Sequence, residues 1–186
     1  MVFNKKKLLL MLLVFIASFT FIQNNKVEAA INNKPGDIII TNDTSSKGVA
    51  GHTGIYISKT TILHTSGWKS EPYPTIISES NWHKRYARSK VIRPNSSTLG
   101  NKAANMAVKY FKGKKIPYRV PSTLKNLNSV YCSELVWHSY YKAGKTYKTR
   151  ESSPPKWVVP TSIYPYEFIN SSYVKYNGFK FIDNKW

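Results

Sequence analysis

The chain contains a single cysteine, Cys132, and this limits how its fold can be stabilised. One cysteine cannot close a disulfide within the chain, so a buried apolar core must supply the stability. Residues 131–144 around it place apolar or small side chains at helical spacing and end at Gly144, which predicts a short helix starting at about Cys132. At a helix N-terminus, free backbone N–H groups and the helix dipole favour a thiolate. A lone cysteine on an apolar stripe is, however, more often a small core residue.

The first 29 residues have the three parts of a secretory signal peptide. Three lysines at 5–7 precede an apolar run over 8–22, and small residues lead to Ala29, after which we expect cleavage. An uncleaved membrane anchor is the alternative, although the run is short for a spanning helix. Residues 30–186 then form a single domain of 157 residues, long enough for a real core. We expect a secreted, monomeric protein at a bacterial cell surface.

The predicted mature chain is strongly basic. It keeps 24 basic and 8 acidic residues, a formal charge of +16. Such a surface attracts polyanions, and outside a cell these are anionic wall polymers or acidic lipids rather than a specific nucleic acid. Five of the basic residues cluster within 84–93, and we interpret that cluster as a solvated face.

Two histidines are predicted to lie side by side on a β-hairpin. Residues 51–57 and 61–65 alternate as two strands joined across a short turn. With the turn centred on Lys59, His64 lies opposite Gly54, diagonal to His52 and on the same face of the sheet. A slip of one residue in the register would send one of the histidines to the other face.

The remaining elements indicate a mixed α+β fold. Residues 37–41 predict a short buried strand, and 88–93 predict a further one. A helix capped by Ser96 or Ser97 should run to about Lys112. We expect a loop over 67–82 and a final hairpin that pairs 173–176 with 179–182 around Asn177 and Gly178.

Cysteine catalysis needs a thiol, an imidazole that moves its proton, and a polar group that orients the imidazole. We assign these roles to Cys132, His52 and His64, with the backbone N–H of Cys132 as one oxyanion donor. His138 lies six positions further along the helix and faces away from the thiol, so we exclude it. We expect Glu134 to cap or form a salt bridge with the first turn of the helix.

A family resemblance is carried by four segments in this order: 36–40, 51–57, 62–64 and 131–136. Together they resemble the circularly permuted NlpC/P60 papain-like cysteine hydrolases, most closely the YiiX-like branch. The two-histidine hairpin is also similar to the lecithin retinol acyltransferase group. The resemblance implies a permuted papain-like fold, with an antiparallel sheet packed on the cysteine helix. It also implies Cys132 as nucleophile, His52 as base and His64 at the third polar position.

Two tyrosines extend this predicted site. Residues 116–118 are similar to the Pro-Tyr element that precedes the family's cysteine, which implies that Tyr118 helps to form the oxyanion site. Tyr131 stands where the family pattern has Asp, directly before Cys132, so we count it with the substrate-binding residues. His64 also departs from the pattern, because YiiX-like members often have Glu there. The chemistry is retained, but the substrate is left open.

These features lead to a main hypothesis and several alternatives. The main one is a secreted hydrolase that cleaves amide bonds, most readily in cell-wall peptides, through an acyl-enzyme and without a cofactor. A second keeps the same triad but acts on a lipid acyl ester or amide, as a hydrolase or acyltransferase. A third is a non-catalytic cationic module that adheres to wall or membrane. Zinc binding by the two histidines and the thiolate is disfavoured, because the chain has no close His-x-x-x-His pair.

Overall fold

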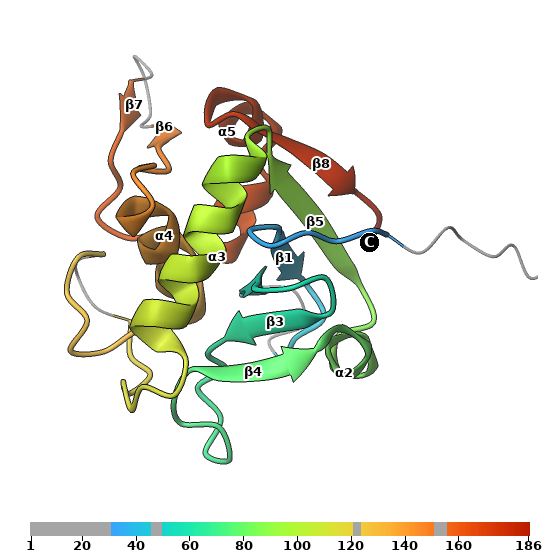
Figure 1. The fold of residues 1–186 in the computed structure, drawn as a ribbon, viewed down its shortest axis with the longest axis vertical. Helices are drawn as coiled ribbons and strands as arrows, with labels where there is room; N and C mark the ends of the chain where they lie inside the picture. Colours follow the sequence, from blue (N-terminus) through green and yellow to red (C-terminus); the bar gives the residue numbers. More distant parts are fainter. Residues whose placement is uncertain (1–30, 46–49, 121–123, 151–155) are drawn as a thin grey trace, which may run out of the picture. The chain divides into compact units, whose positions relative to one another are not determined.

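An antiparallel sheet of six strands carries the fold, in the spatial order β4-β3-β2-β1-β5-β8 (Figure 1). The structure, a computed structural model, describes residues 31–45, 50–120, 124–150 and 156–186. The strands are β1 (Ile38–Thr41), β2 (His52–Tyr56), β3 (Thr61–His64), β4 (Thr75–Ser78), β5 (Ser89–Pro94) and β8 (Phe179–Asp183). The mixed α+β class and the antiparallel sheet are therefore confirmed.

The predicted hairpin of β2 and β3 has the expected register. Gly54 lies opposite His64, and Tyr56 opposite Ile62. The predicted strands 37–41 and 88–93 are also confirmed, as β1 and β5, and they pair with each other. Because β1 is buried along its whole length and paired on both sides, it forms the centre of the sheet.

The two faces of the sheet bury different clusters. On one face, Ile38 and Ile40 of β1 belong to the larger core, which also includes residues of α3 (Ser97–Phe111) and α4 (Cys132–Lys142). On the other face, Ile39 belongs to a smaller cluster that contains Trp82 from α2 (Glu79–Arg85). The cysteine helix thus packs on one face of the sheet, while α2 covers the other.

The two predicted helices begin and end where the local sequence indicates. Ser96 caps α3, and its hydroxyl accepts a hydrogen bond from the Leu99 backbone N–H at 3.2 Å. Gly113 follows α3 and Gly144 follows α4, each with a positive φ that suits a residue without a side chain. Helix α4 begins at Cys132, as expected.

The structure differs from the predicted loop over 67–82. That range contains β4 and most of α2, because residues 75–78 pair with β3 and so continue the sheet. Ser78 then caps α2 by accepting from the backbone N–H of Asn81. The two prolines of the range precede β4 and do not interrupt it. The loop prediction was wrong for this second half.

The predicted C-terminal hairpin is also wrong in its first half. Residues 173–176 lie in α5 (Ser171–Tyr176), since the Asn170 side chain accepts from two backbone N–H groups and starts a helix there. The chain reaches α5 through β6 (Thr149–Arg150), β7 (Trp157–Val158) and a 3-10 helix, η1 (Pro165–Ile169). Only β8 keeps the predicted strand, and it pairs with β5.

The basic cluster within 84–93 is only partly a solvated face. Arg85 forms a salt bridge with Glu71, and Arg93 forms one with the buried Asp37. Within the described residues, no helix has both the length and the apolar character needed to cross a bilayer. The predicted signal peptide lies outside the described residues, so it stays a prediction.

Candidate functional site

The two hairpin histidines contact each other directly. His52 is the first residue of β2 and His64 the last of β3, and 3.0 Å separates His52 Nε2 from His64 Nδ1. The side chain of His64 is fully buried, and His52 is nearly so. His52 Nε2 is engaged in the hydrogen bond with His64, so Nδ1 of His52 remains available to a second partner.

One tautomer of this pair makes His52 a proton acceptor. If His52 Nε2–H donates to His64 Nδ1, the lone pair of His52 lies on Nδ1. His64 then carries its proton on Nε2, a buried atom that has no hydrogen-bond partner among the described residues. A neutral His64 acceptor therefore fixes both the orientation and the tautomer that a general base requires.

Helix α2 packs directly against the histidine pair, on the face of the sheet opposite α4. The Trp82 indole stacks on His52, with ring centroids 5.4 Å apart and planes 18° from parallel. It also meets His64 edge-on at 5.6 Å, and its Nε1–H donates to Ser89 Oγ at 3.0 Å. Tyr86 follows the helix and lies 5.4 Å from His52. Sequence reasoning missed these supports, because their segment was predicted to be a loop or a charged surface.

The surroundings keep both imidazoles neutral. Burial lowers the pKa of His52 well below its ordinary value, and the charges of His64 and Arg85 act in the same direction. Burial also lowers the pKa of His64 to about 4; Glu71 opposes this shift and Arg85 adds to it. Arg85 and Glu71 are joined by two hydrogen bonds of 2.8 and 2.7 Å, so their effects on the pair partly cancel.

Cys132 starts α4 and is almost completely buried. Burial raises the pKa of its thiol, and the Ser133 hydroxyl together with the backbone N–H groups of Thr53, Ser133 and Cys132 opposes the shift only in part. The thiolate expected from the helix N-terminus is therefore not the resting state. Among the described residues no hydrogen bond joins the sulfur to an imidazole, but Sγ interacts with Thr53, the residue next to His52.

The two predicted tyrosines differ in what their hydroxyls contact. Tyr118 interacts with Cys132. Burial is the main cause that raises the pKa of Tyr118, and Cys132 adds to it, so the hydroxyl stays protonated and can donate a hydrogen bond. Tyr131 instead accepts a hydrogen bond from the Ile163 backbone N–H at 3.0 Å. The structure thus brings Tyr118 to the thiol, while the Tyr131 hydroxyl ties two chain segments together. A substrate contact by Tyr131 stays a prediction.

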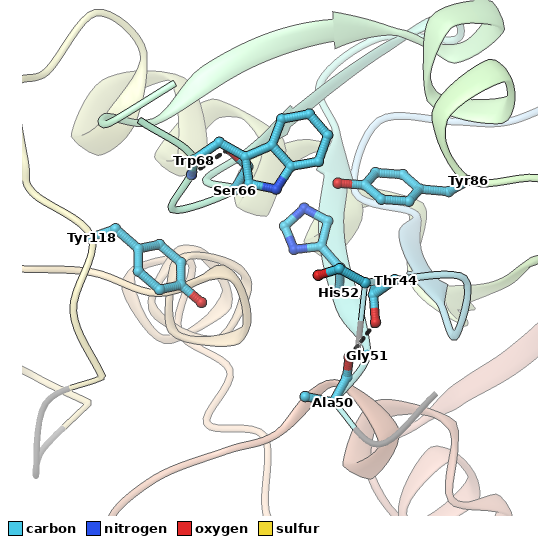
Figure 2. A pocket seen from close by; sticks show the side chains of 9 residues that line it. Thr44, Ala50, Gly51, His52, Ser66, Trp68, Tyr86 and Tyr118 are labelled. Atoms are coloured by element: carbon cyan, nitrogen blue, oxygen red, sulfur yellow. Dashed lines mark hydrogen bonds between the residues drawn. The ribbon is translucent and has the colours of Figure 1, made fainter. Parts of the chain in front are cut away.

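A hollow of about 220 Å³ opens above His52. Figure 2 shows His52 between Tyr118 and Tyr86, with Trp68 nearby and Thr44, Ala50 and Gly51 below. Aromatic rings thus form much of its wall, and a buried imidazole lies at its base. The hollow therefore has room for a small group next to His52, the predicted base.

Two further residues of α4 lie away from this hollow. The ring of His138 packs edge-on against Tyr110 and Phe111 of α3, which agrees with its exclusion as the base. Glu134 is fully buried and forms no salt bridge within the described part of the chain; its carboxyl lies near the backbone N–H of Tyr131, the N-cap residue of α4, without a regular hydrogen bond. The predicted salt bridge is absent there, and the predicted capping role is reduced to this backbone contact, because the larger core closes over the first turn of α4.

We expect iodoacetamide to alkylate Cys132 slowly at neutral pH, with a rate that rises about tenfold per pH unit to beyond pH ~9. Burial raises the thiol pKa, and below that pKa the thiolate fraction grows tenfold per unit. Intact-mass kinetics between pH 5 and 10, on wild type and His52→Gln, would measure this. A rate plateau below pH ~7 that disappears in His52→Gln would contradict it, since that profile belongs to a thiolate–imidazolium pair.

Comparisons with known proteins agree with this fold. A family profile described as "Lipoprotein N-acylation protein LnsA-like" matches residues 4–176. A Bacillus thuringiensis protein, "Uncharacterized 30.3 kDa protein", is 35% identical over 120 residues, which cover 58% of this chain. Those residues span 44% of that protein, less than half of its length.

A solved structure shares the architecture at low sequence identity. The crystal structure of metalloprotein yiiX from Escherichia coli O157:H7, DUF1105, matches with a TM-score of 0.60 at 16% identity. The match covers 83% of this chain and 99% of that one. At this identity the likeness shows the fold alone, and it supports the YiiX-like branch of the predicted resemblance.

That neighbour is described as a metalloprotein, so we tested whether this chain offers a comparable donor set. The described residues contain no group of three or more His, Cys, Asp and Glu side chains that could hold a metal ion. The two histidines also use one ring nitrogen each, His52 Nε2 and His64 Nδ1, for the hydrogen bond between them. The residues of this site therefore do not fit a metal centre, and we derive no step through one.

Proposed function

Because the chain belongs to the LnsA-like family of lipoprotein N-acylation proteins, we propose that it transfers an acyl group through a thioester on Cys132. The donor is an acyl ester lipid, and the acceptor is the free N-terminal amine of a lipoprotein at the cell envelope, with water as a slower alternative. This reading selects the lipid alternative over wall-peptide hydrolysis, since N-acylation is the activity in the family description. The proposal keeps the Cys132, His52 and His64 roles.

The first half of the reaction forms the thioester. Cys132 Sγ attacks the ester carbonyl while His52 Nδ1 takes the thiol proton. The Cys132 backbone N–H and the Tyr118 hydroxyl donate to the oxyanion. The carbonyl then re-forms, the ester C–O bond breaks, and His52 returns its proton to the leaving alcohol oxygen. Since both groups rest neutral, the proton moves during the attack rather than before it.

The second half delivers the acyl group. The acceptor amine attacks the thioester carbonyl, His52 removes a proton from its nitrogen, the C–S bond breaks, and the thiolate regains that proton. Throughout, His64 accepts from His52 Nε2–H and stabilises the transient imidazolium. Catalytic contacts are often loose without substrate, so a bound carbonyl is expected to bring Sγ and His52 within hydrogen-bonding distance.

One observation carries this proposal. His52 Nε2 lies 3.0 Å from His64 Nδ1, and His52 is followed in β2 by Thr53, whose backbone interacts with the Cys132 sulfur. We also propose that the fold is a circularly permuted papain-like one. In its support, the base and its orienting residue precede the nucleophile in the chain, and the nucleophile begins a helix packed on the sheet.

Acyl transfer can be tested by trapping the intermediate. We expect the full chain, mixed with phospholipid vesicles, to gain the mass of one acyl chain on Cys132 that neutral hydroxylamine removes. Addition of a lipopeptide with a free N-terminal amine should then move the chain to that amine. Cys132→Ala should gain no mass, and Cys132→Ser should hold a hydroxylamine-resistant ester.

Two outcomes would contradict the proposal. Release of peptides from cell-wall material, with no acyl adduct from lipid, would restore amide hydrolysis as the activity. Equal behaviour of wild type and Cys132→Ala in both assays, with binding that fades steeply as salt rises, would leave the non-catalytic cationic module.

A further inference from the structure

Three exposed apolar side chains belong to the hollow above His52 or to chain segments next to it. Trp68 is 46% exposed, Val120 62% and Tyr164 59%; together we call these three residues the apolar rim. Single exposed apolar residues are ordinary on protein surfaces, but a group around one opening typically marks a contact surface. The three residues can form such a surface only if the segments that carry them are neighbours in the fold.

Trp68 and Val120 are connected through Tyr118. Trp68 and Tyr118 both line the hollow. The backbone at Gly67 lies so close to the Tyr118 ring that a Cβ there would fall 2.8 Å from a ring carbon. Val120 follows Tyr118 by two residues, so it continues from the same wall.

Tyr164 joins the same edge through the entry to α4. Tyr118 pairs with Val130 in a parallel bridge, which places it beside the residue before Tyr131. The Tyr131 hydroxyl accepts from the backbone N–H of Ile163, the residue before Tyr164. The three rim residues therefore belong to segments that are linked by contacts near the thiol and the hollow.

The charge beside the rim is positive. Lys69 and Arg119 are exposed, and neither takes part in an ion pair within the described residues. The acid on the Trp68 segment, Glu71, is already bound by Arg85, whose guanidinium lies 4.5 Å from the centre of the Trp68 ring. Apolar and aromatic tips flanked by free cations suit the headgroup region of an acidic bilayer.

We propose that the apolar rim, flanked by Lys69 and Arg119, docks on the surface of an anionic phospholipid bilayer and places the hollow against the lipid headgroups. This inference rests on the proposed function, because that reaction must reach an ester that lies at the headgroup level. The rim side chains enter the interface, and the cations contact lipid phosphates.

The test uses tryptophan quenching by brominated lipid in the full chain. We expect vesicles of brominated phosphatidylglycerol to quench the wild-type fluorescence, Trp68→Phe to lose most of that quenching, and Trp186→Phe to keep it. Trp186 is a matched control, since it is 43% exposed and lines a different hollow. Quenching that Trp68→Phe leaves unchanged would overturn the proposal, even if another segment holds the chain on the membrane.

A second pair of variants tests the rim without changing a tryptophan. The double variant Val120→Asp with Tyr164→Asp should reduce this Trp68 quenching about tenfold at limiting lipid. Val108→Asp, at a 37% exposed position on α3, should not. Equal losses in the rim variant and the control would contradict a specific docking surface.

Docking and catalysis can fail separately. Cys132→Ala should be quenched as fully as wild type, because docking does not need the thiol. Normal quenching without any acyl adduct would overturn the proposed function and leave the docking surface standing. An acyl adduct formed from detergent-dispersed lipid, with no quenching of Trp68 by vesicles, would overturn the docking surface alone.

Discussion

Replacing His52 with glutamine is expected to lower kcat/KM for acyl transfer by about 10³-fold or more. Glutamine keeps a polar side chain that can still contact His64, but it cannot take the thiol proton. The neutral resting state makes this dependence severe, because burial raises the thiol pKa and leaves little thiolate to react unaided. Steady-state transfer to a lipopeptide amine, with thermal unfolding of each variant as a folding check, measures the effect.

Two other histidine variants sharpen this prediction. His64→Asn keeps a hydrogen-bond acceptor for His52 Nε2–H, so its loss should be smaller than that of His52→Gln. His138→Gln changes another buried histidine, which packs on α3, and should keep near-normal transfer in the folded fraction. If His52→Gln stays within about tenfold of wild type, His52 is not the general base.

The position of the histidine pair could be predicted because it depends on local rules. Alternation along two short strands and a turn centred on Lys59 fix the register, and the register alone places His64 diagonal to His52. The start of α4 at Cys132 and its stop before Gly144 likewise follow from nearby residues. For these elements, contacts across the fold agree with the local pattern.

Helix α2 could not be predicted in the same way. Its sequence is polar apart from Trp82, so no apolar stripe distinguishes it from a loop. What holds it is the second face of the sheet, where Trp82 packs with Ile39, Tyr56 and Ile62. These residues come from three separate strands, and their common face is known only once the sheet is assembled.

The protonation of the site depends on burial in the same non-local way. Position at a helix N-terminus predicts a thiolate at Cys132, yet the closing of the core around it raises the thiol pKa. In the tail, Asn177 and Gly178 suggested a hairpin, but the Asn170 cap creates α5 just before them. Turn residues identify where the chain bends, and here they follow a helix rather than join two strands.

Glu134 should make the folded state less stable as the pH rises. Its side chain is fully buried in the first turn of α4, and among the described residues it has no regular hydrogen bond beyond its contact with the Tyr131 backbone N–H. Burial raises its pKa to about 8, and the Tyr131 backbone N–H opposes this only in part. The folded chain therefore holds a proton that the unfolded chain releases near pH 4.5. Its contribution is complete below that pH and is lost as the pH rises through about 8.

The effect of Glu134 on stability can be measured separately from other titrating groups only over a narrow pH range. Below about pH 6.5 the lowered pKa values of His52 and His64 change stability with the opposite sign, and above about 9 the Cys132 thiol begins to contribute. Between pH 7 and 8 the free energy of unfolding should fall by about 1 kcal/mol, somewhat less than the ~1.4 kcal/mol per unit of one whole proton, because Glu134 in the folded chain is itself half ionised at about pH 8. Urea unfolding at several pH values measures this slope.

Glu134→Gln should abolish that slope, because the amide has the same shape and no charge to bury. At pH ~8.5 the variant should be more stable than wild type, by about 1–3 kcal/mol, although two polar atoms remain buried. Asp183→Asn, at a half-exposed acid that ends β8, should keep the wild-type slope. If Glu134→Gln and wild type fall in parallel, Glu134 is already ionised at neutral pH and must have a partner within the folded chain.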